Sequence, residues 1–132
     1  MLLRLWHSVI FLGQADGNQT IYVDGVAGTP VSIIGVGNIA QMSGLALGYK
    51  VPSSSSLTYW RDLISETQVV LFSALPSNIT SIISQISNQK KCLASYPNGT
   101  ITFWNDPKNG IIDKSGNGNN LTNVGNAPIV RK

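Results

Sequence analysis

Residues 16–26, DGNQTIYVDGV, hold a short strand pattern between two Asp-Gly pairs. The β-branched and aromatic side chains of residues 20–23 favour an extended backbone. Asp-Gly pairs readily adopt the positive φ angles of tight hairpin turns, so the pairs that begin at Asp16 and Asp24 are expected to reverse the chain. The stretch therefore predicts a strand that a turn joins to an antiparallel neighbour at each end.

The same pattern recurs along the chain. Other turn pairs begin at Asn98, Asn109 and Ser115, and other strand-like segments lie at residues 31–36, 69–72 and 100–104. Residues 77–89 differ, because four isoleucines follow Pro76 at the spacing of one helix face. We expect an all-β chain, an antiparallel β-sandwich with one short helix near residues 77–88, folded as a single domain over residues 1–132.

The composition suits a protein whose surface is covered by neutral polar groups. Of 132 residues, 42% are hydrophobic and only 11% are charged, against about 25% charged in an average soluble domain. Such a chain suits a virion, an extracellular or cell-surface location, or a protein that hides much of its surface against neighbours. The net charge of +3 forms no basic stripe, so nucleic acid is not an expected partner. No apolar run is long enough to span a membrane.

Two parts of the chain resemble the two ends of one known sandwich. The strand WHSVIF at residues 6–11, YVDG at 22–25 and LISETQVVLFSAL at 63–75 resemble the closing half of laminin-G-like, concanavalin-A-like lectin-glucanase modules. The segment TITFWNDPKNGIIDKSGNGNNLT at 100–122 resembles the opening half, in the form found in phage tail-fibre and virion-surface proteins. The resemblance implies a jelly-roll sandwich. Because the closing half comes first, it also implies a permuted module, part of a repeat array, or a domain completed by neighbouring chains.

Two loops contain oxygen-bearing side chains that are candidate metal ligands. In calcium-binding members of the resembled superfamily, carboxylates and loop carbonyls at the sandwich rim hold the ion, which would assign Asp24, Asp113 and Asn117 as ligands. Calcium takes six to eight oxygens, and Asp24 alone does not supply them. The alternative is that Asp24 only forms its turn and that the side chains of residues 113–120 cap their own backbone N–H groups. Calcium is left open here, and no other cofactor is expected.

Aromatic side chains could form a platform on which a sugar ring stacks. The candidates are Tyr59, Trp60 and Trp104, with Asn119 from the polar loop beside them. The alternative is that these rings belong to the core, because aromatic side chains supply much of the buried surface of a small domain. Both interpretations are open at this point.

No catalytic site is predicted. Hydrolysis of a glycosidic bond usually needs two carboxylates that flank the bond, and the closely spaced Glu and Asp motif of the superfamily's glucanases does not occur in this sequence. Glu66 shares a strand face with Ile64, so its carboxylate needs hydrogen-bond donors if that face is buried. We therefore expect a non-catalytic structural or decorating module of a virion or cell-surface assembly. A glycan-binding adhesion module of the lectin type is the alternative.

Association with other subunits is expected from the sheet edges. Residues 31–36 and 100–104 contain no Lys, Arg, Glu or Asp, and an uncharged exposed edge is a template for pairing with another strand. The expected partners are further copies of this chain or a larger virion or surface assembly. In the alternative function, the partner is a cell-surface glycan.

Overall fold

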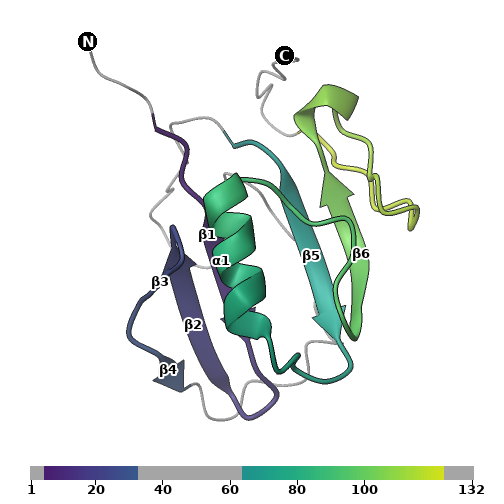
Figure 1. Cartoon of the computed structure of the whole chain (residues 1–132). Coiled ribbons are helices and arrows are strands. Elements are labelled where there is room, and N and C mark those ends of the chain that lie inside the picture. The colour runs from purple at the N-terminus through teal and green to yellow at the C-terminus, as the bar shows by residue number, and fades with distance from the viewer. Residues whose placement is uncertain (1–4, 33–63, 124–132) are drawn as a thin grey trace, which may run out of the picture. The chain divides into compact units, whose positions relative to one another are not determined.

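The computed structural model describes residues 5–32 and 64–123 (Figure 1). The chain divides into two compact units. The first comprises Met1–Asn38 and Leu71–Thr100, and the second comprises Ile39–Val70 and Ile101–Lys132. Each unit therefore combines two segments that are distant in the sequence.

The first unit contains a four-stranded antiparallel sheet. Its strands are β1 (Val9–Gly13), β2 (Asn18–Val23), β3 (Val26–Ala27) and β4 (Val31–Ser32). Strand β2 is central, because it pairs with β1 along one edge and with both β3 and β4 along the other. The strand predicted between the two Asp-Gly pairs is thus the centre of this sheet.

Both predicted hairpin turns are present. Between β1 and β2, the Gln14 amide donates to the Asn18 carbonyl at 2.8 Å, and the Asp16 carboxylate accepts from the backbone and side chain of Asn18. Between β2 and β3, Asp24 and Gly25 have φ angles of 50° and 83°. Two consecutive positive φ angles are the geometry of a two-residue hairpin whose twist matches that of its strands.

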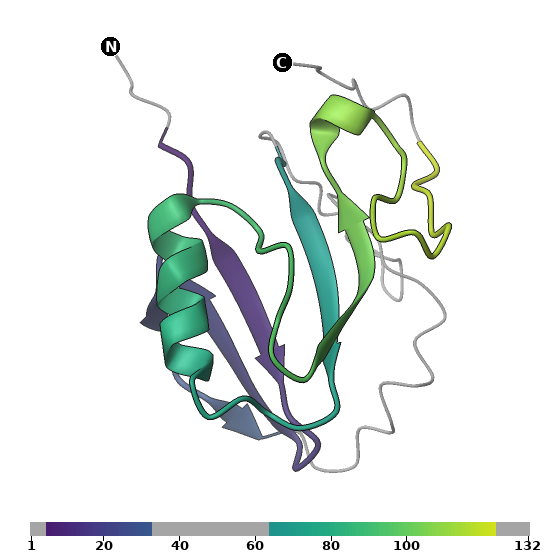
Figure 2. The same cartoon turned by 45° about the vertical axis from the view of Figure 1, so that its right-hand side comes forward.

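The helix α1 (Ile79–Gln89) covers one face of the β1–β2 pair (Figures 1 and 2). Ile82 and Ile83 are buried, and the isoleucine spacing that predicted the helix gives it an apolar side. The helix ends at Lys90, whose φ of 50° is left-handed. The predicted helix near residues 77–88 is confirmed.

Substitution of Gly25 tests how closely α1 approaches the hairpin turn. A Cβ added at Gly25 would lie 3.3 Å from the Cβ of Ser87 in α1, whereas a Cβ added at Gly116 meets nothing within 4 Å. The two glycines have similar φ angles, 83° and 87°, so each alanine variant bears a similar conformational cost of about 1–2 kcal/mol. We expect Gly25→Ala to lower the free energy of unfolding more than Gly116→Ala in urea denaturation. Equal losses would show that α1 does not press on the turn.

Strands β5 (Thr67–Phe72) and β6 (Gly99–Asn105) form a second, two-stranded antiparallel sheet. The Ser73 amide donates to the Asn98 carbonyl at 3.0 Å, and the Thr102 hydroxyl donates to the Val69 carbonyl at 3.3 Å. Asn98, at the predicted Asn-Gly turn, has a φ of 55°. After β6 the chain makes a short 3₁₀ helix, η2 (Pro107–Asn109), which the Asp106 side chain caps by accepting from the Lys108 amide.

The sequence therefore predicted these local elements correctly. The segments at 69–72 and 100–104 lie in β5 and β6, and Val31 and Ser32 of the segment at 31–36 form β4, while residues 33–36 lie outside the described ranges. The described residues are mostly β, with antiparallel sheets and one short α-helix, and the jelly-roll sandwich stays a prediction. Within residues 5–32 and 64–123, no helix has the length and apolar character needed to cross a membrane.

Candidate functional site

The carboxylate of Asp113 is the centre of a hydrogen-bonded loop in the second unit. Its Oδ1 accepts from the backbone amides of Trp104 at 3.0 Å and Ser115 at 2.9 Å. Its Oδ2 accepts from the Ser115 hydroxyl and from the Asn119 amide, both at 2.9 Å. Asp113 is only 6% exposed. Both oxygens of this candidate metal ligand are therefore engaged by the chain itself.

These donors decide the protonation of Asp113. Burial raises the pKa of its carboxyl, but the amides of Trp104, Ser115 and Asn119 and the Ser115 hydroxyl favour the charged form more strongly and lower the pKa to about 2. The carboxylate is thus charged at neutral pH and is stabilised without a cation. A metal ion at Asp113 would have to compete with the donors that already surround it.

The asparagines of the same loop attach it to β6. The Asn117 side-chain amide donates to the carbonyls of Ile101 at 3.1 Å and Thr102 at 3.2 Å, and the Asn119 side-chain amide donates to Thr102 at 2.9 Å. The Asn120 side-chain oxygen accepts from the Asp113 amide at 2.8 Å. The structure thus shows the self-capping arrangement that was one of the two predictions for residues 113–120.

Trp104 is held by charged groups on two sides. Its indole Nε1–H donates to Glu66 Oε1 at 2.8 Å, and Lys114 Nζ lies 4.3 Å from the ring centroid. The Trp104 side chain is half-buried. Glu66 precedes β5 and is half-buried, while Ile64, which was expected to share its face, is exposed. A sugar stacked on Trp104 would share the ring with Lys114, and the role of Trp104 in glycan binding stays a prediction.

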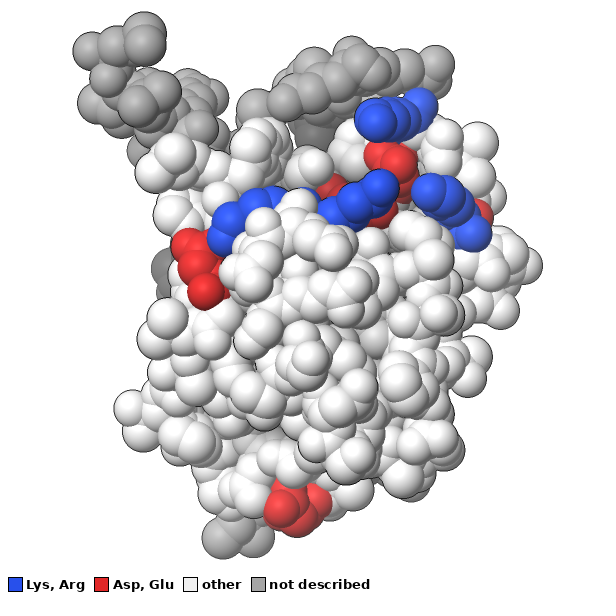
Figure 3. All heavy atoms as spheres, viewed as in Figure 1, with Lys and Arg blue, Asp and Glu red and all other residues white. Residues whose placement is uncertain are grey.

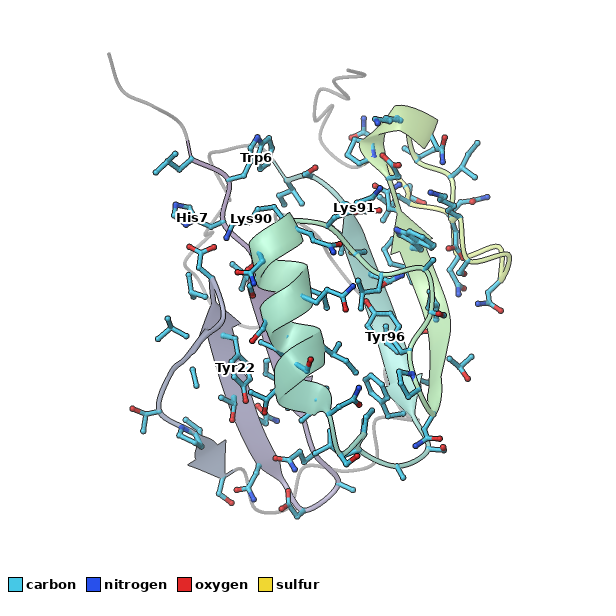
Figure 4. The ribbon with its side chains drawn as sticks, in the orientation of Figure 1. Trp6, His7, Tyr22, Lys90, Lys91 and Tyr96 are labelled. Atoms are coloured by element: carbon cyan, nitrogen blue, oxygen red, sulfur yellow. The ribbon has the colours of Figure 1, made fainter. Side chains whose placement is uncertain are left out.

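Asp24 lies in a cluster with His7, Ser8 and Lys90 at the end of the first unit's sheet, where Figure 4 labels His7 and Lys90. His7 Nδ1 is 2.5 Å from Asp24 Oδ2, while the Ser8 amide and the Lys90 ammonium both donate to Oδ1. Hydrogen bonds from His7, Lys90 and Ser8 hold the pKa of the Asp24 carboxyl well below its usual range. Asp24 therefore does more than form its turn. It connects the start of β1, the β2–β3 hairpin and the C-terminal end of α1.

The charged residues next to α1 follow its C-terminal end. Residues 79–89 contain no charged side chain, and Lys90 and Lys91 come directly after the helix (Figure 3). Each of the predicted ligands Asp24 and Asp113 has its own set of partners within its own unit. Within residues 5–32 and 64–123, no three His, Cys, Asp or Glu side chains are grouped as metal ligands would be. Tyr59 and Trp60 lie outside the described residues.

The face of the β1–β2 sheet that points away from α1 is apolar. Ser8, just before β1, donates its hydroxyl to Ser87 of α1 at 3.0 Å. Successive side chains of a strand point to opposite faces, so Ile10 and Leu12 share the helix-bearing face with Ser8. The register pairs Ile10 with Tyr22 and Leu12 with Thr20, and Thr20 is buried. Val9 and Phe11 must then lie on the opposite face.

The register extends this opposite face across all four strands. The paired residues form three rows across the strands. The first row is Val9, Val23 and Val26, and the middle row is Phe11 and Ile21. The third row is Gly13, Gln19 and Val31. We call Val9, Phe11, Ile21, Val23, Val26 and Val31 the open face. These six side chains are between 47% and 72% exposed. An antiparallel sheet with one solvated face normally has polar residues there, and here Gln19 is the single polar member of the three rows.

Sequence reasoning missed the open face, although a signal for it exists. The segment VIFL, which begins at Val9, is a continuous apolar run, and IYV, which begins at Ile21, is another. A strand that is apolar at both odd and even positions is typical of burial on both faces. The prediction of assembly rested instead on sheet edges, which are not the largest apolar feature of the described residues.

Comparison with known proteins gives no assignment for this chain: no family model, no curated protein and no solved structure matches it.

Proposed function

We propose that this chain is a non-catalytic structural or decorating module that buries its open face against another subunit of a virion or cell-surface assembly. The observation that carries the proposal is the open face itself. The largest exposed apolar patch of a soluble protein is often a functional contact surface. The sequence resemblance to virion-surface modules, and the domain completed by neighbouring chains that it implies, support the same conclusion.

Burial of the open face has a substantial driving force. Fully burying one Val, Ile or Phe side chain contributes about 1.5–3 kcal/mol. Because each of the six is about half exposed or more, covering the face contributes on the order of 1 kcal/mol per side chain. A β-sheet with helix on one side and a second sheet on the other is a stable layer arrangement. The proposed sandwich is therefore completed by a layer that another subunit supplies.

The polar loops support a structural role. The side chains that could bind an ion or a sugar at residues 113–120 are used to hold the loop onto β6 through Asp113, Asn117 and Asn119. The Asp24 carboxylate is used to join β1, the hairpin and α1. In both places polar groups secure the fold that presents the open face.

Incorporation into particles tests the proposal. The tagged chain is expected in purified particles or in the surface fraction of its source, and Val23→Lys is expected to lose most of this signal because it places a charge on the open face. Leu75→Lys is the matched control, since Leu75 is 44% exposed in the segment that leads into α1. A wild-type chain absent from both fractions would contradict the proposal, as would normal incorporation of Val23→Lys.

Glycan binding is the second candidate function, and Trp104 is the observation that favours it. Glu66 and Lys114 fix the orientation of its half-buried indole beside the loop at residues 113–120. A preset aromatic ring costs little conformational entropy when a ligand stacks on it. A glycan array, probed with and without calcium, tests this function. Binding that survives Trp104→Ala would exclude Trp104 as the platform.

A further inference from the structure

We propose that the subunit covering the open face is a second copy of this chain, packed face to face about a two-fold axis. The inference rests on the proposed function, because it names the subunit that supplies the second layer. Two sheets that pack face to face lie about 10 Å apart. The six apolar side chains of each copy would then form one shared interior, with a copy of α1 on each outer side.

The absence of charge on the open face favours an identical partner. A two-fold contact uses the same patch on both subunits, so a charged residue near its centre would meet a like charge. The three rows of outward residues on β1 to β4 contain no Lys, Arg, Asp or Glu. The charged residues of the hairpins, Asp16 and Asp24, lie in the turns at the two ends. Contacts between different proteins usually gain their specificity from complementary charges. The open face has no charged residue that could provide such specificity.

The Phe11 ring adds to the apolar surface that a second copy would meet. A Cβ added at Gly13 would lie 3.5 Å from Cε1 of this ring, so the ring lies close to Gly13 in the same strand. Phe11 is also 62% exposed. In a two-fold contact the same apolar ring is presented by both copies.

The size of the open face predicts a weak dimer. The largest apolar patch on a typical monomeric protein covers about 300–600 Å², and six side chains that are about half exposed or more make a face of that order. A standard interface buries about 800 Å² per partner. The open face alone is smaller than this, so we expect a dimer that dissociates on dilution through the micromolar range.

Sedimentation velocity with opposite charges at Ile21 tests the inference. Ile21 lies in the middle row of the open face and is half exposed, so a charge there can be solvated in the folded monomer. Ile21→Lys and Ile21→Glu are each expected to raise the dimer dissociation constant by about 100-fold or more, because each copy would bury an unpaired charge. We place the two-fold axis beside Ile21, at the centre of the open face, so an equimolar mixture of the two variants pairs Lys with Glu and is expected to recover association. Circular dichroism shows that each variant is folded, and Leu75→Lys is expected to dimerise like wild type.

Each outcome separates the second copy from other occupants. A wild-type chain that stays monomeric up to about 100 µM, well above a micromolar dissociation constant, would overturn the inference. Unchanged dimerisation of Ile21→Lys, or a mixture of Lys and Glu variants that stays monomeric, would overturn it as well. If the purified chain is monomeric while Val23→Lys is still lost from particles, the proposed function stands and a different subunit covers the face.

Discussion

Ile83→Ala is expected to lower the free energy of unfolding by about 2–5 kcal/mol, the usual loss when a buried isoleucine is truncated. Ile83 is 3% exposed and lies next to Ile82 on the buried side of α1. Its truncation leaves a cavity that the neighbouring side chains fill only in part. Denaturant unfolding followed by circular dichroism measures the change.

Ile79→Ala is the matched control for this prediction. Ile79 begins the same helix but is only half-buried, so its truncation should cost clearly less than that of Ile83. Equal losses at the two positions would mean that α1 does not pack on the sheet through the side that carries Ile83. The account of the first unit would then be wrong.

Asp113→Ala is expected to lower the free energy of unfolding by about 3 kcal/mol. Three backbone amides and one hydroxyl lose their acceptor in this variant. Each buried donor left without an acceptor costs about 1–3 kcal/mol. The control is Asp106→Ala, since Asp106 accepts from a single backbone amide at the start of η2. A cap of that kind contributes about 1 kcal/mol. Thermal unfolding of the two variants at neutral pH compares them, and similar losses would contradict the central role of Asp113.

The stabilisation by Asp113 should also depend on pH in a defined direction. The pKa of its carboxyl falls from the ordinary 3.8 to about 2 on folding. A lowered folded-state pKa stabilises the protein above the unfolded-state pKa, and this stabilisation is lost as the pH falls through the folded value. The difference in stability between wild type and Asp113→Asn should thus be constant above about pH 5 and shrink between about pH 4 and pH 2. A difference that persists unchanged at pH 2 would exclude the carboxylate as its cause.

Local structure was predictable because short-range chemistry determines it. The Asp-Gly pair at Asp24 requires positive φ angles, which a hairpin turn supplies, and the isoleucines from Ile79 to Ile86 have the spacing of one helix face. These features depend only on neighbours in the sequence. The locations of β2, β5 and β6 followed from the same kind of pattern, although each strand begins one or two residues earlier than predicted.

The remaining features depend on contacts between distant segments. Sequence alone left two roles open for Asp113, since only the fold brings the Trp104 amide to its carboxylate. The link from Asp24 to His7 and Lys90 joins residues up to 66 positions apart. The open face could not be assigned before the structure showed which side of the β1–β2 pair α1 covers. The role of Val9 and Phe11 therefore followed from the placement of Ser87.

Hydroxyl-radical footprinting of Phe11 tests the central claim most directly, because it reports whether the open face is covered in the assembled protein. The chain is oxidised below and above the concentration at which it associates, and the modified residues are identified by mass spectrometry. We predict that oxidation of Phe11 and Ile21 falls several-fold on association while that of Leu75 stays constant. Equal oxidation of Phe11 in the free and associated chain would contradict the claim that the open face is an assembly surface.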